Sequence, residues 1–295
     1  MTDRIALDAL NRLDDAGFVA ALGGVFENAP WVAEAVLPGR PYGSLAFLHA
    51  AMSAAVRDAP AERRLALLRG HPDLAGKAAR AGAMTDESKA EQAGAGLDRL
   101  TEAEYDRFHE LNAAYQAKFG FPFIVCVRRH GKESILRSFE RRLAHTPEQE
   151  LAAALEEVLR IGALRIDQKV TAADRLPLAG RLSTHVLDTH RGRPAAGVEI
   201  ELFELWGEER RPVARGVTNA DGRTDAPLIS GRPVPIARYE LRFGLGDYFA
   251  GLGVALADPP FLDVVPIRFA VGEPEGHYHV PLLATPWGYT TYRGS

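Results

Sequence analysis

The chain has 295 residues and a formal net charge of -4, with 46% hydrophobic and 25% charged residues. This balance is typical of a soluble protein and gives no electrostatic basis for a nucleic-acid or membrane partner. The single cysteine, Cys126, excludes an internal disulfide. The sequence shows no secretory signal, and no stretch approaches the roughly 18 apolar residues of a membrane helix. We therefore expect a cytoplasmic protein with two domains.

Residues 1–170 have the pattern of an all-α domain. Thr101 precedes Glu104 with the spacing of a capping box, and Thr146 precedes a proline that suits the first position of a helix. Gly120 is placed to end a helix. Apolar residues recur at helical spacing in residues 44–56, 61–70, 102–120, 132–145 and 147–170. The apolar run 121–127 interrupts this pattern, and we interpret it as a buried extended stretch.

From residue 181 the pattern changes to that of an all-β domain, residues 181–295, and residues 171–180 read as a linker. The turn signal at residues 219–222 and a second turn at residues 286–288 separate runs of alternating polarity. Such runs, typical of a small β-sandwich, occupy residues 182–188, 197–205, 237–245, 263–271 and 277–280.

Three patches of the helical part carry groups suited to chemistry, although each also has a structural explanation. His71 lies in the loop sequence GHPDL, and on this spacing alone the structural explanation, exposure ahead of a helix, is favoured. Ser88 and Glu91 have capping-box spacing, but with Gln92 they would also gather polar groups at a helix N-terminus, which favours anions. The run 119–128 reads either as a core strand or as part of a binding site.

Together these patches resemble the 2-oxo-4-hydroxy-4-carboxy-5-ureidoimidazoline (OHCU) decarboxylases of urate degradation. The resemblance also includes Pro30-Trp31 and the segments LNAAY, KFGFPFIV and RIGALRI, in the family's order. It implies an all-α fold, no cofactor, and His71 as the catalytic acid. It further implies that the substrate is held by Pro72, Ser88, Glu91, Gln92, Arg165 and the backbone of Phe123, Ile124, Val125, Cys126 and Val127.

The chemistry agrees with a cofactor-free site. When a carboxylate leaves as CO2, the substrate ring itself takes up the electron pair, so neither a metal nor pyridoxal phosphate is required. A histidine is suited to deliver a proton near neutral pH. Glu91 would either fix the tautomer of that histidine or bond the substrate hydroxyl, and the sequence leaves both roles open.

In the second part, the histidines and one arginine form the notable set. His185 lies on a predicted strand, Arg223 flanks an Asp-Gly turn, and His277 and His279 would share one face of a strand. Each has a structural explanation, and the His-x-His pair could also form one edge of a zinc site. The lone cysteine and the lack of a nearby carboxylate disfavour a closed zinc site, so we expect no metal.

The segments THVLD, DGR, HYHVPLL and the final YRGS resemble the 5-hydroxyisourate hydrolases, which are related to transthyretin. The resemblance implies a transthyretin-like sandwich with His185, Arg223 and His279 as catalytic residues. Tyr292 and Ser295 would line the site, and the assignment of base and donor between the two catalytic histidines stays open. It also implies a homo-oligomer, at least a dimer and by analogy a tetramer, with sites at subunit interfaces.

These two resemblances predict a bifunctional enzyme that acts on small molecules in consecutive steps of urate degradation. An alternative is a transthyretin-like small-molecule carrier fused to a helical interaction domain. Retention of His185, Arg223, His279 and YRGS disfavours the carrier, which has no use for that set. A third hypothesis is a zinc hydrolase that uses the His-Tyr-His segment.

Overall fold

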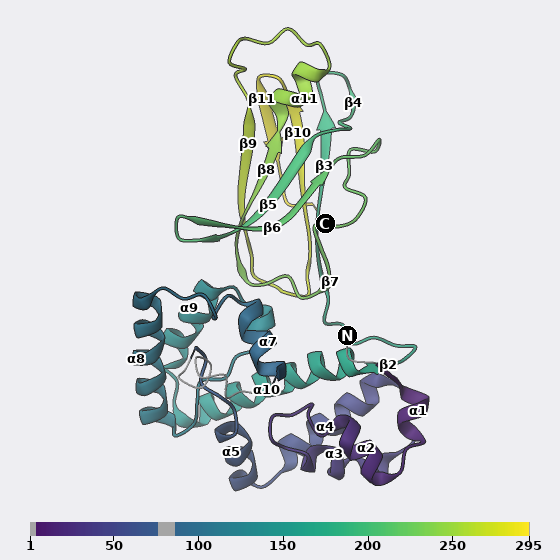
Figure 1. The fold of residues 1–295 in the computed structure, drawn as a ribbon, viewed down its shortest axis with the longest axis vertical. Coiled ribbons are helices and arrows are strands. Elements are labelled where there is room, and N and C mark those ends of the chain that lie inside the picture. Colours follow the sequence, from purple (N-terminus) through teal and green to yellow (C-terminus); the bar gives the residue numbers. More distant parts are fainter. Residues whose placement is uncertain (1–3, 76–85, 295) are drawn as a thin grey trace. The chain divides into compact units, whose positions relative to one another are not determined.

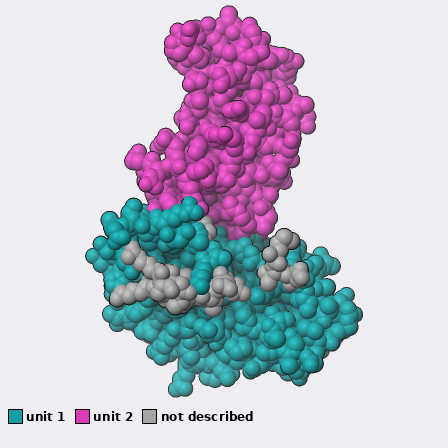
Figure 2. Space-filling model, in the orientation of Figure 1, with its two compact units in different colours: residues 1–128, 135–178 teal, residues 129–134, 179–295 magenta. Residues whose placement is uncertain are grey.

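The computed structural model describes residues 4–75 and 86–294, and the chain divides into two compact units (Figure 2). The first unit takes in the helical part through Leu178, and the second runs from Ala179 onward and includes residues 129–134. No helix within the described ranges has the length and apolar character needed to cross a membrane.

The first unit is helical, as predicted (Figure 1). Its core is built from the apolar faces of these helices, with large buried side chains such as Phe18, Phe108 and Tyr115. The short parallel pair β1 (Ile5–Ala6) and β2 (Val170–Thr171) is absent from the all-α prediction. The end of η2 and the start of α9 fall in residues 129–134 of the second unit. The helices of this part of the chain are α1 (Leu7–Asn11), α2 (Asp15–Leu22), α3 (Trp31–Ala35), η1 (Leu37–Gly39), α4 (Leu45–Asp58), α5 (Ala61–Arg69), α7 (Asp86–Gly94), α8 (Glu102–Phe119), η2 (Val127–Arg129), α9 (Lys132–Arg142) and α10 (Pro147–Lys169).

The predicted helix signals are confirmed at both ends of α8 and at the start of α10. Thr101 and Glu104 form a reciprocal capping box, and Gly120 adopts φ 75° in the left-handed region that favours glycine. Thr146 caps α10 with the help of Gln149. These local bonds satisfy backbone groups that a helix end would otherwise leave without partners.

Helix α10 organises the first unit because it packs against α4, α5 and α8. Its second half is almost entirely buried from Val158 to Asp167, apart from Arg160. A helix buried on most of its surface must carry its polar side chains to internal partners. The site described below uses several of those partners.

Residues 171–178, which we expected to be part of a linker, pack on the helical unit. The Asp174 carboxylate accepts hydrogen bonds from the backbone N–H groups of Leu45 (2.9 Å) and Ala46 (3.0 Å), at the N-terminus of α4. Leu176 and Leu178 pack against the helical core. The segment is therefore held by a helix N-terminus and by apolar contacts rather than extended in solvent.

The second unit is sheet-rich, as predicted, and its described strands form two sheets (Figure 1). One sheet has the order β11-β10-β3-β4, with β7 also paired to β3, and the other has the order β6-β5-β8-β9. Strand β6 was missed because its three arginines, its proline and its glycine hide the alternation. The elements are β3 (Gly180–Asp188), β4 (Arg193–Pro194), β5 (Glu199–Trp206), β6 (Glu209–Val217), β7 (Ile229–Arg232), β8 (Ala237–Gly244), α11 (Leu245–Gly251), β9 (Val264–Val271), β10 (His277–Thr285) and β11 (Gly288–Thr291).

The strands that carry the predicted histidines are neighbours. β3 and β10 pair in parallel, with His279 opposite Ser183 and His185 opposite Pro281. Tyr278 and Val280 are buried while His277 is exposed, which confirms the predicted alternation of β10. The predicted turn at 286–288 is also present, because β10 and β11 form a hairpin whose last pair is Thr285 with Gly288.

Candidate functional sites

A pocket in the helical unit collects most of the residues predicted for the first site. The pocket is open to solvent, and its empty volume, which includes solvent space at the mouth, is about 360 Å³. The sequence did not point to Leu74 or Ile161. The lining consists of His71, Pro72, Leu74, Ser88, Glu91, Gln92, Phe123, Ile124, Val125, Val127, Ile161 and Arg165.

His71 follows Gly70 at the C-terminal end of α5. Its Nδ1 lies 2.8 Å from the carbonyl oxygen of Leu67. Because a carbonyl only accepts, Nδ1 carries the hydrogen, and Nε2 is the ring nitrogen left for proton exchange. Burial lowers the pKa of His71, and the nearby Arg165 acts in the same direction, while the bond to Leu67 and the charge of Glu27 oppose the shift. The imidazole is therefore neutral at pH 7.

Arg165 of α10 is the centre of a buried charge network. Its side chain is 3% exposed and binds Glu27 at 2.8 Å and Glu91 at 2.9 Å. It also donates to the Ser88 hydroxyl at 3.3 Å, and that hydroxyl donates to Glu27 at 3.2 Å. Burial opposes the charge of Arg165, but the two carboxylates outweigh it and raise its pKa. Four of its five N–H donors are thus engaged by described residues.

Glu27 is a member of this network that the sequence analysis missed, because it lies in no motif. A signal did exist: Arg165 falls within an apolar stretch of a predicted helix, and a buried arginine requires an acidic partner.

Ser88 requires a correction. It is the third residue of α7 rather than the N-cap, so its capping-box spacing with Glu91 is not used.

Two side chains hold the loop that carries His71 and Pro72. Gln92 accepts a hydrogen bond from the Ala75 N–H at 3.0 Å and donates to the Asp73 carbonyl at 3.4 Å. Asn112 of α8 donates to the Leu74 carbonyl at 2.9 Å. Gln92 therefore lines the pocket and also fixes the loop beside it.

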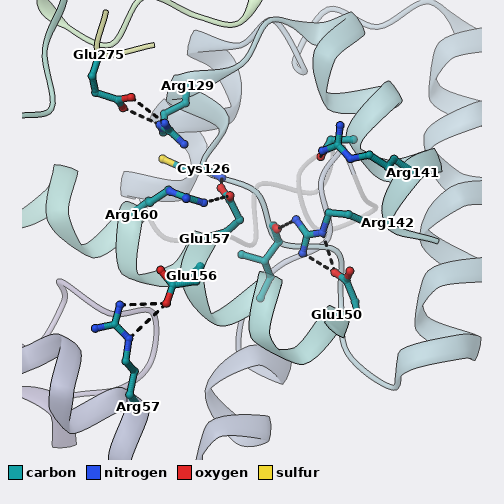
Figure 3. A network of polar contacts seen from close by, with 12 residues as sticks. Arg57, Cys126, Arg129, Arg141, Arg142, Glu150, Glu156, Glu157, Arg160 and Glu275 are labelled. Atoms are coloured by element: carbon teal, nitrogen blue, oxygen red, sulfur yellow. Dashed lines mark hydrogen bonds and ion pairs between the residues drawn. The ribbon is translucent and has the colours of Figure 1, made fainter. Parts of the chain in front are cut away.

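Residues 121–126 are buried but take part in no regular strand, so the predicted extended stretch has no strand partner. Residues 123–125 and Val127 line the pocket, whereas Cys126 does not. The backbone N–H of Cys126 instead donates to the Glu157 carboxylate at 2.8 Å (Figure 3).

The second predicted site lies on β3 and β10. The imidazole rings of His185 and His279 are 6.5 Å apart between centroids. Ser183 is buried, and its hydroxyl hydrogen-bonds Nδ1 of His279 at 3.0 Å and Nε2 of His277 at 3.3 Å. Nε2 of His185 is buried and has no hydrogen-bond partner among the described residues. Buried polar atoms without a partner are uncommon and often mark catalytic groups or sites of bound water.

Arg223 reaches this site through a tight turn. The Asn219 side chain accepts hydrogen bonds from the N–H groups of Asp221 (3.1 Å) and Arg223 (3.2 Å). Gly222 adopts φ 72°, and a Cβ there would lie 2.3 Å from the carbonyl oxygen of Val186. Only glycine fits this position, where the turn approaches β3. The turn places the backbone of Arg223 beside that of His185, and the two residues form an isolated antiparallel β-bridge.

The last described residues fold back onto β10. Gly294 forms an isolated backbone β-bridge with His279, and the Gly294 N–H donates to the backbone carbonyl oxygen of His279 at 2.8 Å. Tyr292 is 57% exposed, so its side chain does not line an enclosed cavity in this unit. The predicted site residue Ser295 lies outside the described residues.

Burial lowers the pKa values of both His185 and His279, and the positive charge of Arg223 lowers them further. Both rings are consequently neutral at pH 7. Within residues 4–75 and 86–294, no group of three or more His, Cys, Asp or Glu side chains is arranged to hold a metal ion.

Comparison with known proteins places both units in families. A model described as OHCU decarboxylase matches residues 11–167, and one described as HIUase/transthyretin family matches residues 182–294. A 5-hydroxyisourate hydrolase of Deinococcus radiodurans is 61% identical over 39% of this chain and 95% of its own length. An OHCU decarboxylase of Haloferax volcanii is 42% identical over 57% of this chain and 98% of its own length.

One solved structure spans both units. The crystal structure of (S)-allantoin synthase covers 99% of this chain and 100% of its own, with 37% identity and a TM-score of 0.53. Fold and similarity thus define a fusion of two enzyme domains, a decarboxylase followed by a hydrolase. The chain belongs to the OHCU decarboxylase family through its helical unit and to the HIUase/transthyretin family through its sheet-rich unit. Both resemblances and their order are confirmed.

Proposed function

We propose that the chain is a bifunctional enzyme of urate degradation. Its sheet-rich unit hydrolyses 5-hydroxyisourate to OHCU, and its helical unit decarboxylates OHCU to (S)-allantoin. The observation that carries this proposal is the joining of both families in one chain that matches an (S)-allantoin synthase over nearly its whole length. The lining of the helical pocket and the His185–His279–Arg223 cluster supply the chemical groups that the two reactions need.

In the decarboxylation, His71 moves a proton. Loss of CO2 sends an electron pair toward the imine nitrogen of the ring. This nitrogen takes up a proton from solvent, and an enol remains. Neutral Nε2 of His71 accepts the hydroxyl proton of this enol and delivers it to the carbon that bears the ureido group. Delivery from one side of a fixed ring makes one enantiomer. Pro72, Gln92 and the backbone of residues 123–125 and 127 hold the ring in this proposal.

Arg165 and Glu91 take the remaining roles in the helical pocket. Arg165 helps to bind the anionic groups of the substrate while it keeps Glu27 and Glu91 in place. Glu91, fixed by two bonds from Arg165, is positioned to accept a hydrogen bond from the substrate hydroxyl or a ring N–H. Cys126 is not part of the lining and its backbone N–H binds Glu157, so its contribution in this proposal is to hold the segment beside the pocket.

In the hydrolysis, a water molecule attacks a ring carbonyl of 5-hydroxyisourate. One of the neutral histidines, His185 or His279, accepts a proton from that water. When the tetrahedral intermediate collapses, the ring C–N bond of the attacked carbonyl breaks and the imidazolium returns the proton to the leaving nitrogen. The exposed guanidinium of Arg223 makes no side-chain hydrogen bond to a described residue, so it is available to the developing oxyanion. Tyr292 and Ser295 complete the site on the side of the chain end in this proposal.

We also propose that copies of the chain associate through the sheet-rich unit in the cytoplasm, as its family relationship suggests. Strand β11 lies at a sheet edge, and the exposed Trp287 and Tyr289 lie on or beside it. Sedimentation of the full chain measures this association directly, and a strictly monomeric protein at micromolar concentration would contradict it.

Joining two consecutive activities in one chain also raises the local concentration of the second site around the first product.

The decisive experiment adds freshly prepared 5-hydroxyisourate to the full chain. Ultraviolet absorbance follows its hydrolysis, and circular dichroism follows the appearance of (S)-allantoin, because uncatalysed decay gives the racemate. We expect both steps to be accelerated over buffer. If neither signal changes faster than in buffer, the proposed function is wrong.

A further inference from the structure

The wall of the decarboxylase pocket is a backbone segment that no sheet supports. Residues 121–126 are buried and take part in no strand, so no sheet pairing supplies hydrogen bonds to their backbone groups. Residues 123–125 of this segment line the pocket. Whatever fixes the segment therefore also fixes the groups that face the substrate.

Arg142 of α9 holds the segment at Ile124. Its Nη1 donates to the Ile124 carbonyl at 2.7 Å, and its guanidinium lies over the Phe123 ring at 4.6 Å. The opposite side of the guanidinium binds the Glu150 carboxylate, with Nε at 2.9 Å (Figure 3). Glu150 is fully buried and is also bonded by His145 at 2.7 Å. Arg142 is thus a clamp between a buried carboxylate and two consecutive residues of the wall.

Glu157 of α10 holds the same segment two residues further along. Its carboxylate accepts the Cys126 N–H at 2.8 Å, and it pairs with Arg160 on the solvent side (Figure 3). The two contacts reach the wall by different routes, one through an arginine and one directly. They enclose Val125, which lines the pocket.

Both acids belong to one stripe of α10. Glu150, Glu157, Ile161 and Arg165 follow one another at spacings of seven, four and four residues, which keeps them on one face of a helix. Ile161 lines the pocket, and Arg165 is its buried cation. A single rigid helix therefore carries the cation of the site and both anchors of the facing wall.

We propose that Glu157, and Glu150 acting through Arg142, are positioning residues of the decarboxylase that fix the backbone around Val125 relative to Arg165. The proposal rests on the decarboxylase function proposed above. Neither acid lines the pocket. Their effect on catalysis is therefore indirect, through the place at which the wall meets the substrate.

The test compares two adjacent acids of α10 in the full chain. Glu157→Ala removes the anchor of Cys126, whereas Glu156→Ala removes an exposed ion pair with Arg57 that does not touch the wall (Figure 3). We expect Glu157→Ala to raise the KM for OHCU about five- to tenfold, the factor of one lost hydrogen bond. Glu156→Ala should leave KM unchanged. Hydrolysis of 5-hydroxyisourate by the same molecules reports the concentration of the chain, and the far-ultraviolet circular dichroism of the helices reports whether the helical unit is folded.

Two further variants separate positioning from general stability. Glu157→Gln keeps a carbonyl oxygen for the Cys126 N–H, so KM should return close to that of the unmodified chain. Arg142→Lys keeps the charge beside Glu150 but lacks the planar fork that reaches both Glu150 and Ile124, so KM should rise as in Glu157→Ala.

Three results would overturn the proposal. They are an unchanged KM in both Glu157→Ala and Arg142→Lys, an equal effect of Glu156→Ala, or a fall in kcat alone that parallels the loss of folded protein. An unmodified chain that fails to decarboxylate OHCU would instead reject the proposed function, which keeps the two failures distinct.

Discussion

The arginines of the two sites differ in burial and in the number of side chains that they bind. Arg165 of the helical pocket is buried and already bound to two carboxylates and a serine hydroxyl. Arg223 of the sheet-rich unit is exposed, and its guanidinium binds no described side chain. An arginine whose donors are engaged chiefly holds the site together, whereas a free one is available to charge that develops on the substrate. The comparison predicts a scaffolding role for one cation and a direct role for the other.

The histidines, in contrast, are treated alike in both units. Burial lowers the pKa values of His71, His185 and His279, although the first lies after a helix and the others lie on strands. A neutral imidazole is the form that accepts a proton. In both folds, burial of the imidazole lowers its pKa and keeps the ring neutral, in the form that accepts a proton.

The sharpest separation of the two sites is the replacement of His71. We expect His71→Ala to slow decarboxylation by about 10²- to 10⁴-fold, the usual contribution of a positioned acid or base. Hydrolysis should continue at the unmodified rate because His71 belongs to the helical unit. Circular dichroism of the product measures the first effect, and the ultraviolet decay of 5-hydroxyisourate measures the second.

The matched control is His109→Ala, which removes an exposed histidine of α8 in the same unit. This variant should keep both activities. Production of (S)-allantoin at the normal rate by His71→Ala would remove that residue from the mechanism.

The turn that delivers Arg223 gives the next largest effect. In Gly222→Ala the new Cβ would lie 2.3 Å from the Val186 carbonyl oxygen, so the turn must shift and move Arg223. Displacement of a catalytic group by about 1 Å lowers a rate by up to 10²-fold, and we expect hydrolysis to fall by about 10- to 100-fold. Steady-state hydrolysis measures this, with decarboxylation as the internal reference.

Gly231→Ala separates crowding from backbone strain. Gly231 adopts φ 70°, close to the 72° of Gly222, but a Cβ there meets no atom within 4 Å. Both variants thus carry the cost of a left-handed alanine, and only one is crowded. Equal losses of hydrolysis in the two variants would contradict the role of the turn.

A smaller effect is expected at Ser183, which contacts both histidines of β10. Ser183→Ala removes the hydrogen bond to Nδ1 of His279 and should lower kcat/KM for hydrolysis about fivefold, as for one neutral hydrogen bond. Ser183→Thr retains the hydroxyl and is the conservative control. If alanine and threonine behave alike, the hydroxyl does not orient the imidazole.

Much of the fold was predictable because its signals are local. The capping boxes at Thr101 and Thr146 and the glycine at Gly120 act within a few residues, so the sequence displays them directly. Strand β6 was not predictable in this way, since its pairing with β5 stabilises a segment whose own alternation is weak. Long-range pairing of this kind leaves little trace in a single stretch of sequence.

The same distinction applies to the sites. The motifs name His71, Ser88, Glu91 and Gln92, and the structure brings all four to one pocket. Glu27 was missed because its partner, Arg165, lies 138 residues away along the chain. The role of Glu157 in holding the Cys126 N–H was equally hidden, because it depends on how a helix packs against an irregular segment. Partners that meet only through tertiary packing have no fixed spacing.

The pH dependence gives the smallest effect and tests the property that the two sites share. A base with the ordinary histidine pKa near 6.5 is half protonated at that pH and has lost about half its activity. The pKa values of His71, His185 and His279 are lowered, so each ring stays neutral at pH 6.5 and takes up its proton only at lower pH. Both activities should therefore lose less than about twofold between pH 7.5 and pH 6.5.

Below the lowered pKa values the two units should differ in the shape of their profiles. The helical pocket titrates through His71, so decarboxylation should fall along a single limb, about tenfold per pH unit. In the sheet-rich unit the charge of His185 lowers the pKa of His279, so protonation of one ring hinders the other and the limb should broaden. Initial rates of each step on the same protein samples measure both limbs. A midpoint above pH 6.5 for either activity would contradict the lowered pKa values, because a raised pKa moves the loss of the neutral imidazole to higher pH.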